Sequence, residues 1–171
     1  MFDAAAPSGV KMTQRTKPKA SHGTALIKVS ACGVNPVDAK YIIGDKLPES
    51  WMPWAAKRAS GHTPGFDFSG TVVSVESNSR GIKAGDAVFG FACNPAKFAV
   101  TSLTGSFAEF VAAPLNQIAA KPAALSHVEA AALPLVGTTA LQAFRQHKQE
   151  ASRQHVTDRL LWWPGAVVGA D

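Results

Sequence analysis

Cysteines and long apolar runs are scarce in this chain, and each shortage excludes a class of protein. The 171 residues include only two cysteines, Cys32 and Cys93, which form neither a disulfide framework nor a zinc-finger pattern and favour a reducing compartment. No apolar run reaches about 18 residues, and no charged segment followed by an apolar core opens the chain, so neither a membrane span nor a secretory signal is predicted. We therefore expect a cytoplasmic protein, with the mitochondrion as the alternative.

Aromatic residues are missing where a nucleic-acid-binding surface would need them. The net charge is +5, but the basic residues are scattered between a poorly patterned N-terminal arm and the tail, at Lys11, Arg15, Lys17, Lys19, Arg145, Lys148, Arg153 and Arg159. Aromatic side chains do not alternate with them as a stacking platform requires, so nucleic acid is not an expected partner. A phosphate-bearing cofactor would suit such a mildly basic surface.

Glycine and proline are frequent and divide the chain into short segments. With 46% hydrophobic residues, the chain can bury one substantial core, and a single domain is expected. The 14 glycines and 11 prolines favour strands and turns over long helices. Residues 66–76 alternate, with Phe68, Gly70 and Val72 on one face. Such runs predict a small barrel or sandwich, and they occur at 25–29, 66–76, 87–91 and 105–111.

A turn and a short helix are predicted after the first strand. Gly33 gives the freedom for a sharp turn, Asn35 suits the N-cap and Pro36 suits the first helical position. Asp38 falls where a capping-box acid lies, and Gly44 is the expected end of the helix. Capping and contact with a ligand are both open for Asn35, because an N-cap leaves its amide nitrogen free to donate.

Helical signals return only late in the chain. Ser126 and Glu129 form a capping box in front of an alanine run that Pro134 is expected to close. A second helix is then expected to start at Thr138 or Thr139. The cations at its far end suit the negative end of a helix dipole.

The order of these segments resembles a known family. Spaced motifs in the right order are far more specific than any one alone, and here they include Cys-Gly-Val-Asn-Pro-Val-Asp at 32–38, Pro-Gly-Phe-Asp-Phe-Ser-Gly at 64–70, and residues 83–86, 105–109 and 129–134. They resemble the GroES-like domain of medium-chain dehydrogenase/reductases, most of all the zinc-free branch of quinone oxidoreductases, enone reductases and enoyl reductases. The resemblance implies a mainly β fold with short helices, arranged as a partly open β-barrel.

The two ends of the chain depart from that family. We divide the chain into an irregular arm at 1–24, the GroES-like domain at 25–147 and an aberrant tail at 148–171. The family continues into a glycine-rich turn that opens a Rossmann domain, whereas residues 160–169 lack a G-x-G-x-x-G pattern. A frameshift, a mis-called intron or a truncated gene model near residue 150 would explain this, since a shifted frame through the Trp162-Trp163 codons can encode a glycine-rich turn. The Rossmann domain, with the surface through which family members usually dimerise, is expected to be missing.

The resemblance also implies a site without zinc. In the zinc alcohol dehydrogenases a cysteine stands at the place of Asn35, and a Gly-His-Glu motif stands at the place of residues 65–67. Cys32 is expected to be a buried structural thiol and His62 a solvated turn residue, so neither replaces a ligand. The reaction that remains is direct hydride transfer from NADPH to a small quinone, enone or other activated alkene.

Four residues are the candidates for this site. By resemblance, Asn35 and Thr139 approach the nicotinamide half of NADPH, and plain helix capping is the alternative for Thr139. Phe66 is either an apolar wall for a flat, conjugated substrate or a core residue. Tyr41 is a candidate donor to the developing enolate, although the tyrosines of related enzymes fall at nearby positions, which leaves the proton donor open.

Two functions from different classes follow. The first is an NADPH-dependent, zinc-independent oxidoreductase, of which this chain is the substrate-binding half. The second is a catalytically inactive remnant or interaction module that kept the barrel. In either case the 171-residue chain alone is expected to show no turnover and to expose apolar surface where a second domain would dock.

Overall fold

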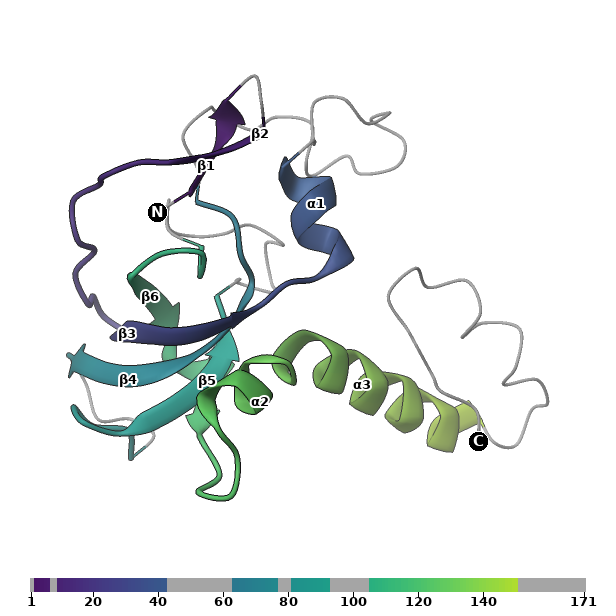
Figure 1. Cartoon of the computed structure of the whole chain (residues 1–171). Helices are drawn as coiled ribbons and strands as arrows, with labels where there is room; N and C mark the ends of the chain where they lie inside the picture. Colours follow the sequence, from purple (N-terminus) through teal and green to yellow (C-terminus); the bar gives the residue numbers. More distant parts are fainter. Residues whose placement is uncertain (1, 7–8, 43–62, 77–80, 93–104, 151–171) are drawn as a thin grey trace.

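The computed structural model describes residues 2–6, 9–42, 63–76, 81–92 and 105–150 (Figure 1). Within these ranges the chain forms a five-stranded antiparallel sheet and a separate two-stranded hairpin, with helices at one end of the sheet. The sheet has the strand order β6-β3-β4-β5-β7. Its strands are β3 (Thr24–Gly33), β4 (Asp67–Val75), β5 (Ala87–Phe91), β6 (Phe110–Pro114) and β7 (Ile118–Ala120).

Strand β4 shows why this sequence forms a half-buried sheet. Phe68, Gly70 and Val72 are buried and Val73 is 40% exposed, so the predicted alternation is confirmed from Gly70 to Val73. At the start of the strand Asp67 and Ser69 are buried as well, so both faces are covered there. A Cβ atom on Gly70 would lie 2.1 Å from the carbonyl oxygen of Lys28 on β3. The two strands therefore approach more closely at this point than any side chain would permit.

One apolar cluster fills the inner face of the sheet. It draws on every strand and on the loop before β5, because the inward positions of each strand carry apolar side chains. Its buried members are Ala25, Ile27, Phe68, Val72, Ile82, Val88, Ala92, Val111, Ala113, Leu115 and Ile118. The packing of this cluster is the main source of stability for the described residues.

The sheet curls without closing. Strands β6 and β7 are the two edges of the sheet order, and a short 3₁₀ turn, Leu115–Gln117, connects them. The register between β3 and β4 shifts between Leu26 and Ile27 and again between Val29 and Ala31, and such irregularities bend a sheet. The predicted fold class, mainly β with few helices in a partly open barrel, is confirmed.

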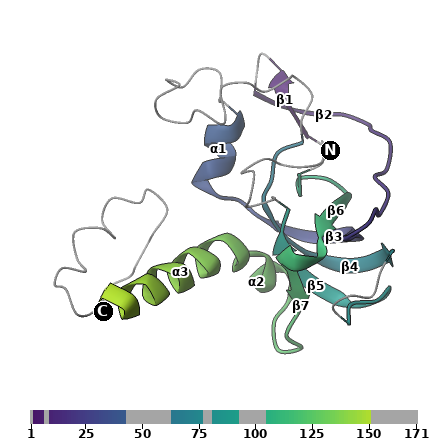
Figure 2. The ribbon, with the colours of Figure 1, turned by 180° about the vertical axis from the view of Figure 1, so that it is seen from behind.

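The helices are α1 (Pro36–Ile42), α2 (His127–Ala131) and α3 (Pro134–Glu150). The predicted capping box is present at α2: the Glu129 backbone N–H donates to Ser126 Oγ at 3.2 Å, and the Ser126 backbone N–H donates to Glu129 Oε2 at 2.8 Å. Figures 1 and 2 show α3 beginning beside the sheet and extending away from it. No helix within the described ranges is both long and apolar enough to cross a membrane.

The predicted start of the last helix is wrong. Pro134 begins α3 and does not merely close the alanine run, which ends as helix at Ala131. Proline suits the first helical position because its missing N–H would have no partner there, and the Gly137 N–H donates to the Leu133 carbonyl at 2.7 Å in the first turn. Thr139 therefore lies in the second turn of α3 and does not start it.

Two further segments differ from the sequence-based expectation. The N-terminal arm contains an antiparallel hairpin of β1 (Phe2–Ala6) and β2 (Gly9–Met12), which the alanine-rich sequence did not predict. The strand predicted at 105–111 begins only at Phe110. Residues 105–107 instead donate backbone hydrogen bonds to the carbonyls of residues 63–65, and this loop pairing takes the place of a sheet ladder.

Candidate functional site

The ends of several elements meet at one end of the sheet, where β3 leads into α1, β4 begins and α2 gives way to α3 (Figure 1). Gly33, the last residue of β3, lies so close to its neighbours that a Cβ atom there would be 2.5 Å from the Ala131 carbonyl oxygen and 3.0 Å from Asp67 Cβ. Glycine is required here by this close approach. Three polar side chains, Asn35, Asp38 and Asp67, are buried at this junction, and we call them the amide–carboxylate cluster.

Asn35 is held on both its backbone and its side chain. Its backbone N–H donates to Asp38 Oδ2 at 2.7 Å, and its Nδ2 donates to Asp67 Oδ2 at 3.0 Å. The first bond confirms Asp38 as the capping acid of α1. The second bond limits the expectation that the amide nitrogen is free to donate, because a buried carboxylate 32 residues away in sequence accepts from one of its two N–H groups. Asn35 remains 8% exposed.

Asp67 connects this end of the sheet to the start of α3. Its side chain is 1% exposed, and its two oxygens lie 3.1 and 3.2 Å from the backbone nitrogen of Leu135. The first N–H groups of a helix have no partner within the helix, and a carboxylate at this end also suits the helix dipole. Sequence reasoning missed this contact because no local pattern links residues 68 positions apart.

Burial changes the acidity of both carboxyl groups. Desolvation raises the pKa of Asp67 to about 7, although hydrogen bonds from the Asn35 side chain and the Leu135 N–H oppose the rise, and the nearby Asp38 charge adds to it. Desolvation likewise raises the pKa of Asp38 to about 6, against the backbone N–H groups of Asn35, Gly65 and Phe66. The pair therefore titrates close to neutral pH, which is unusual for aspartate and typical of functional sites.

The prediction that Cys32 is a buried thiol is wrong. Cys32 occupies an outward position near the end of β3 and is exposed, since residues in this half of the strand alternate between partly exposed and exposed. Its Sγ donates to the Ser106 carbonyl oxygen at 3.2 Å. Partial desolvation of the sulfur and the Asp38 charge both raise the pKa of this thiol, so it is not activated as a thiolate.

Phe66 is a packed side chain. It is 3% exposed and stacks on Phe91, with 5.5 Å between the ring centroids and 20° between the ring planes. The neighbouring Gly65 has a φ of +101°, and a Cβ atom there would lie 2.5 Å from both Phe107 Cδ1 and Ser106 Oγ. The core role of Phe66 thus accounts for its burial, and its role as a substrate wall stays a prediction.

Thr139 is joined to the cluster through the backbone. Its Oγ1 donates to the Leu135 carbonyl oxygen at 2.8 Å, and the N–H of the same Leu135 donates to Asp67. A continuous path of hydrogen bonds therefore runs from Asn35 through Asp67 and Leu135 to Thr139. Because the hydrogen of the Thr139 hydroxyl is used in this bond, its oxygen can only accept a further hydrogen bond.

The other predicted residues are less informative. Tyr41 lies in the last turn of α1, and its side chain is outside the described part of the chain, as is His62. Among the residues that the structure describes, no group of three or more His, Cys, Asp or Glu side chains is placed to hold a metal ion.

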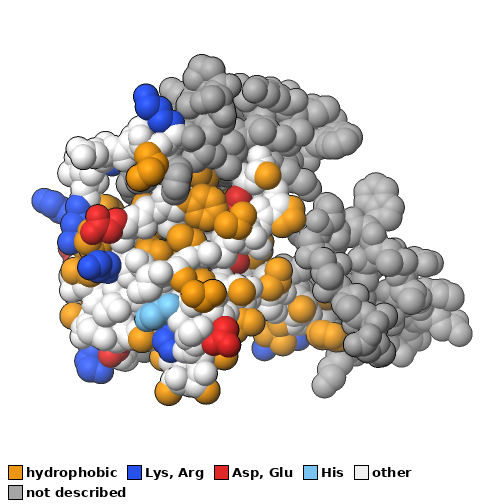
Figure 3. Space-filling view, in the orientation of Figure 1, with side chains coloured by type: hydrophobic (Ala, Val, Ile, Leu, Met, Phe, Trp, Pro, Cys, Tyr) orange, Lys and Arg blue, Asp and Glu red, His pale blue; other side chains and the backbone are white. Residues whose placement is uncertain are grey.

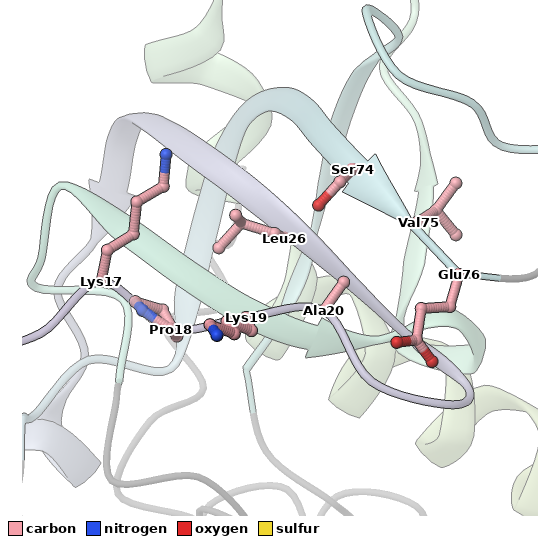
Figure 4. A pocket seen from close by; sticks show the side chains of 8 residues that line it. All are labelled: Lys17, Pro18, Lys19, Ala20, Leu26, Ser74, Val75 and Glu76. Carbon is pink, nitrogen blue, oxygen red and sulfur yellow. The ribbon is translucent and has the colours of Figure 1, made fainter.

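A hollow of about 420 Å³ lies elsewhere on the molecule (Figure 4). Lys17 and Lys19 of the N-terminal arm, Leu26 of β3 and Glu76 after β4 line it. It thus lies toward the beginning of β3 and the end of β4, whereas the amide–carboxylate cluster lies at their other ends. No predicted site residue lines this hollow, and we do not assign it to the site.

Apolar side chains are exposed along α2 and α3. Val128 and Phe144 are 73% and 70% exposed, and Leu133, Val136 and Leu141 add to the same region. Figure 3 shows apolar side chains gathered beside these helices. An apolar patch rimmed by polar residues is typical of a surface that another domain or protein covers.

Comparisons with known proteins show which family and which relatives the chain resembles. The family model described as the alcohol dehydrogenase GroES-like domain matches residues 21–123. A 2-methylene-furan-3-one reductase of Solanum lycopersicum is 37% identical over 130 residues, which cover 75% of this chain and 31% of that protein. A chloroplastic NADPH-dependent alkenal/one oxidoreductase of Arabidopsis thaliana is 36% identical over 124 residues, which cover 72% of this chain and 30% of that protein.

The fold comparison agrees with the sequence comparison. A quinone oxidoreductase from Coxiella burnetii superposes with a TM-score of 0.62 and 29% identity, covering 86% of this chain and 45% of that one. The chain spans about a third of the length of the curated relatives it matches. The three relatives described above are named as reductases of enones or quinones. Because the family model matches more than half of the residues, the chain belongs to the alcohol dehydrogenase GroES-like domain family.

Proposed function

We propose that these residues form the substrate-binding part of an NADPH-dependent reductase that acts on an enone, a quinone or another activated alkene. The support comes from the relatives, which are named for these substrates and, in the Arabidopsis protein, for this cofactor. The buried polar junction beside α3 is the part of the structure that fits such a role. A cytoplasmic location, suggested by the two cysteines, belongs to the same proposal.

The observation that carries the proposal is the hydrogen-bond path between Asn35 and Thr139. The two residues proposed to face the cofactor come from separate parts of the chain. Asp67 contacts Asn35 directly, and it contacts Leu135, to whose carbonyl Thr139 donates. NADPH, when bound, would supply the hydride that reduces the substrate. Asn35 and Thr139 would hold its nicotinamide half, which carries both hydrogen-bond donors and acceptors. Phe66 and Tyr41 would border the substrate, and the proton donor is left unassigned.

Zinc independence is part of the same proposal. By the resemblance, the positions that carry the cysteine and histidine zinc ligands in the zinc alcohol dehydrogenases hold Asn35 and Phe66 here, and the Asn35 amide donates to the neighbouring Asp67 at 3.0 Å. Thiolate and imidazole, the usual partners of zinc, are not the donors at this junction. The chain's own groups at this place bind and orient other groups, and they offer no Lewis acid to polarise a carbonyl.

The second candidate is an inactive remnant that acts as an interaction module. The exposed apolar side chains of α2 and α3 favour it, because they offer a surface for a partner and need no catalysis. The two candidates differ in one expected result. A reductase should turn over substrate once the rest of a related enzyme is joined to this chain, and an inactive remnant should not.

The test compares two proteins with NADPH and a panel of quinones and enones. One is the 171-residue chain, and the other continues after residue 150 with the remainder of the tomato reductase. We expect oxidation of NADPH, followed by loss of its absorbance, for the longer protein and none for the 171-residue chain. A longer protein that binds NADPH but reduces no member of the panel would contradict the reductase and favour the remnant.

A further inference from the structure

The hydrogen bond between Asn35 and Asp67 determines which way the Asn35 amide points. An ionised carboxylate only accepts hydrogen bonds, whereas a side-chain amide has a donating NH₂ and an accepting oxygen. Above the pKa of Asp67, about 7, this carboxyl group is ionised, and Nδ2 placed 3.0 Å from Asp67 Oδ2 makes the favourable pair. The reversed amide would set two oxygens against each other in a buried site, which is costly. The NH₂ group is therefore turned toward Asp67, and the carbonyl oxygen Oδ1 is the acceptor that the Asn35 side chain can offer to a ligand.

The backbone of Asn35 adds to this constraint. Its N–H donates to Asp38 Oδ2 at 2.7 Å, so the backbone nitrogen of Asn35 and one of the two side-chain N–H groups are both bound to carboxyl oxygens. Asp38 also faces Asp67 closely enough to raise its pKa. Two carboxyl groups on one side of the amide reinforce the same orientation.

Asp67 acts on the second candidate residue as well. Both of its oxygens lie within hydrogen-bond distance of the Leu135 nitrogen, which fixes the first turn of α3 against the sheet. Within α3, the carbonyl of Leu135 accepts from Thr139 Oγ1 at 2.8 Å, which uses the only hydrogen of this hydroxyl group. Asn35 Oδ1 and Thr139 Oγ1 can thus both act as acceptors.

We propose that Asp67 is a positioning residue that orients the Asn35 amide and holds the first turn of α3, so that Asn35 Oδ1 and Thr139 Oγ1 serve as two acceptors for donor groups on the nicotinamide half of the cofactor, its ribose hydroxyls or its carboxamide NH₂. This inference rests on the proposed function, because it takes Asn35 and Thr139 to face NADPH. It goes beyond that function in naming the residue that sets the geometry and the chemical sense of each hydrogen bond.

The first experiment reads the amide orientation without any cofactor. In the ¹⁵N-labelled 171-residue chain, we expect the Asn35 side-chain NH₂ resonances to shift when Asp67→Asn removes the accepting carboxylate. The matched control is Asp86→Asn, which alters an acid in the exposed turn around Lys83. Asn35 resonances that respond equally to both variants, or to neither, would overturn the proposed orientation.

The second experiment measures NADPH affinity in the longer protein with the tomato remainder. We expect Asp67→Asn to weaken NADPH binding by about tenfold, the equivalent of one good hydrogen bond, while the melting temperature changes little. The double variant Asn35→Asp with Asp67→Asn exchanges the two groups: the amide at position 67 can donate to the carboxylate at position 35, whose second oxygen remains an acceptor for NADPH. This variant should recover most of the affinity. Asp86→Asn should leave affinity unchanged.

The outcomes separate the two proposals. If affinity falls only in proportion to melting temperature, or if the double variant binds no better than Asp67→Asn, the positioning role is contradicted. If the parent longer protein does not bind NADPH at all, the proposed function fails, whereas the amide orientation is still judged by the resonances of the 171-residue chain.

Discussion

The sheet core and the amide–carboxylate cluster are both buried, but different forces hold them. The core consists of apolar side chains such as Phe68, Ile27 and Val111, each of which is fully buried. The cluster consists of polar groups that need particular partners, with Asp67 serving both Asn35 and Leu135. Apolar burial is non-directional and depends on volume, whereas a buried carboxylate depends on each donor it meets. The core therefore stabilises the fold, and the cluster sets geometry at the end where the elements meet.

The largest expected effect comes from the core. Phe68→Ala removes a fully buried ring from the centre of the sheet and should lower the free energy of unfolding by about 3–5 kcal/mol. Val73→Ala, on the outward side of the same strand and 40% exposed, should cost much less, about 1 kcal/mol or below. Chemical denaturation of both variants measures the difference. Equal losses would mean that the apolar cluster does not dominate stability.

The next largest effect on stability is expected when the carboxyl group of Asp67 is removed from the amide–carboxylate cluster. Asp67→Ala leaves the Asn35 NH₂ and the Leu135 N–H buried without an acceptor and should lower the free energy of unfolding by about 2–3 kcal/mol. Asp86→Ala removes an acid from an exposed ion pair that solvent screens, and it should lower the free energy of unfolding much less. The same denaturation experiment compares them. A loss for Asp67→Ala no greater than for Asp86→Ala would show that the cluster is not stabilising.

The cluster, unlike the core, should respond to pH. The folded-state pKa values of Asp38 and Asp67, about 6 and about 7, lie above the ordinary value of 3.8, so the folded chain binds more protons than the unfolded chain between these limits. Their contribution to stability is thus complete below pH 3.8 and is lost as pH rises through about 6 and then about 7. Each carboxyl group adds a slope of at most about 1.4 kcal/mol per pH unit.

The measurement is the free energy of unfolding across this pH range. Asp67→Asn should remove the part of the slope that extends to about pH 7, while Phe68→Ala should lower the whole curve and keep its shape. Parallel curves for the parent chain and Asp67→Asn would contradict the raised pKa of Asp67.

The smallest effect on stability is expected at the exposed apolar surface of α3. Leu141→Gln with Phe144→Gln replaces side chains that are 50% and 70% exposed and should change the free energy of unfolding by only about 0.5 kcal/mol. Self-association of the 171-residue chain should fall, because the apolar surface is reduced. Analytical ultracentrifugation over a range of concentrations tests this. Unchanged association would mean that another surface is responsible.

Local patterns predicted the parts of the fold that depend on local physics. The alternation along β4 and the Ser126–Glu129 capping box both appear as expected, since each arises between residues a few positions apart. The start of α3 was misplaced because Pro134 suits both the end of one helix and the start of the next. Cys32 was assigned to the interior because cysteine is often buried, although the register of β3 turns it outward.

The sequence by itself determined the strand pattern, the family and the candidates Asn35 and Thr139, because alternation and spaced motifs are visible along the chain. Only the tertiary structure brought Asp67 into contact with both the Asn35 amide and the Leu135 N–H at the start of α3. The reason is that a buried carboxylate takes whichever donors the fold places around it. Those donors are Asn35, just before α1, and Leu135 in α3, which lie far from Asp67 in sequence and meet it only when the sheet has formed.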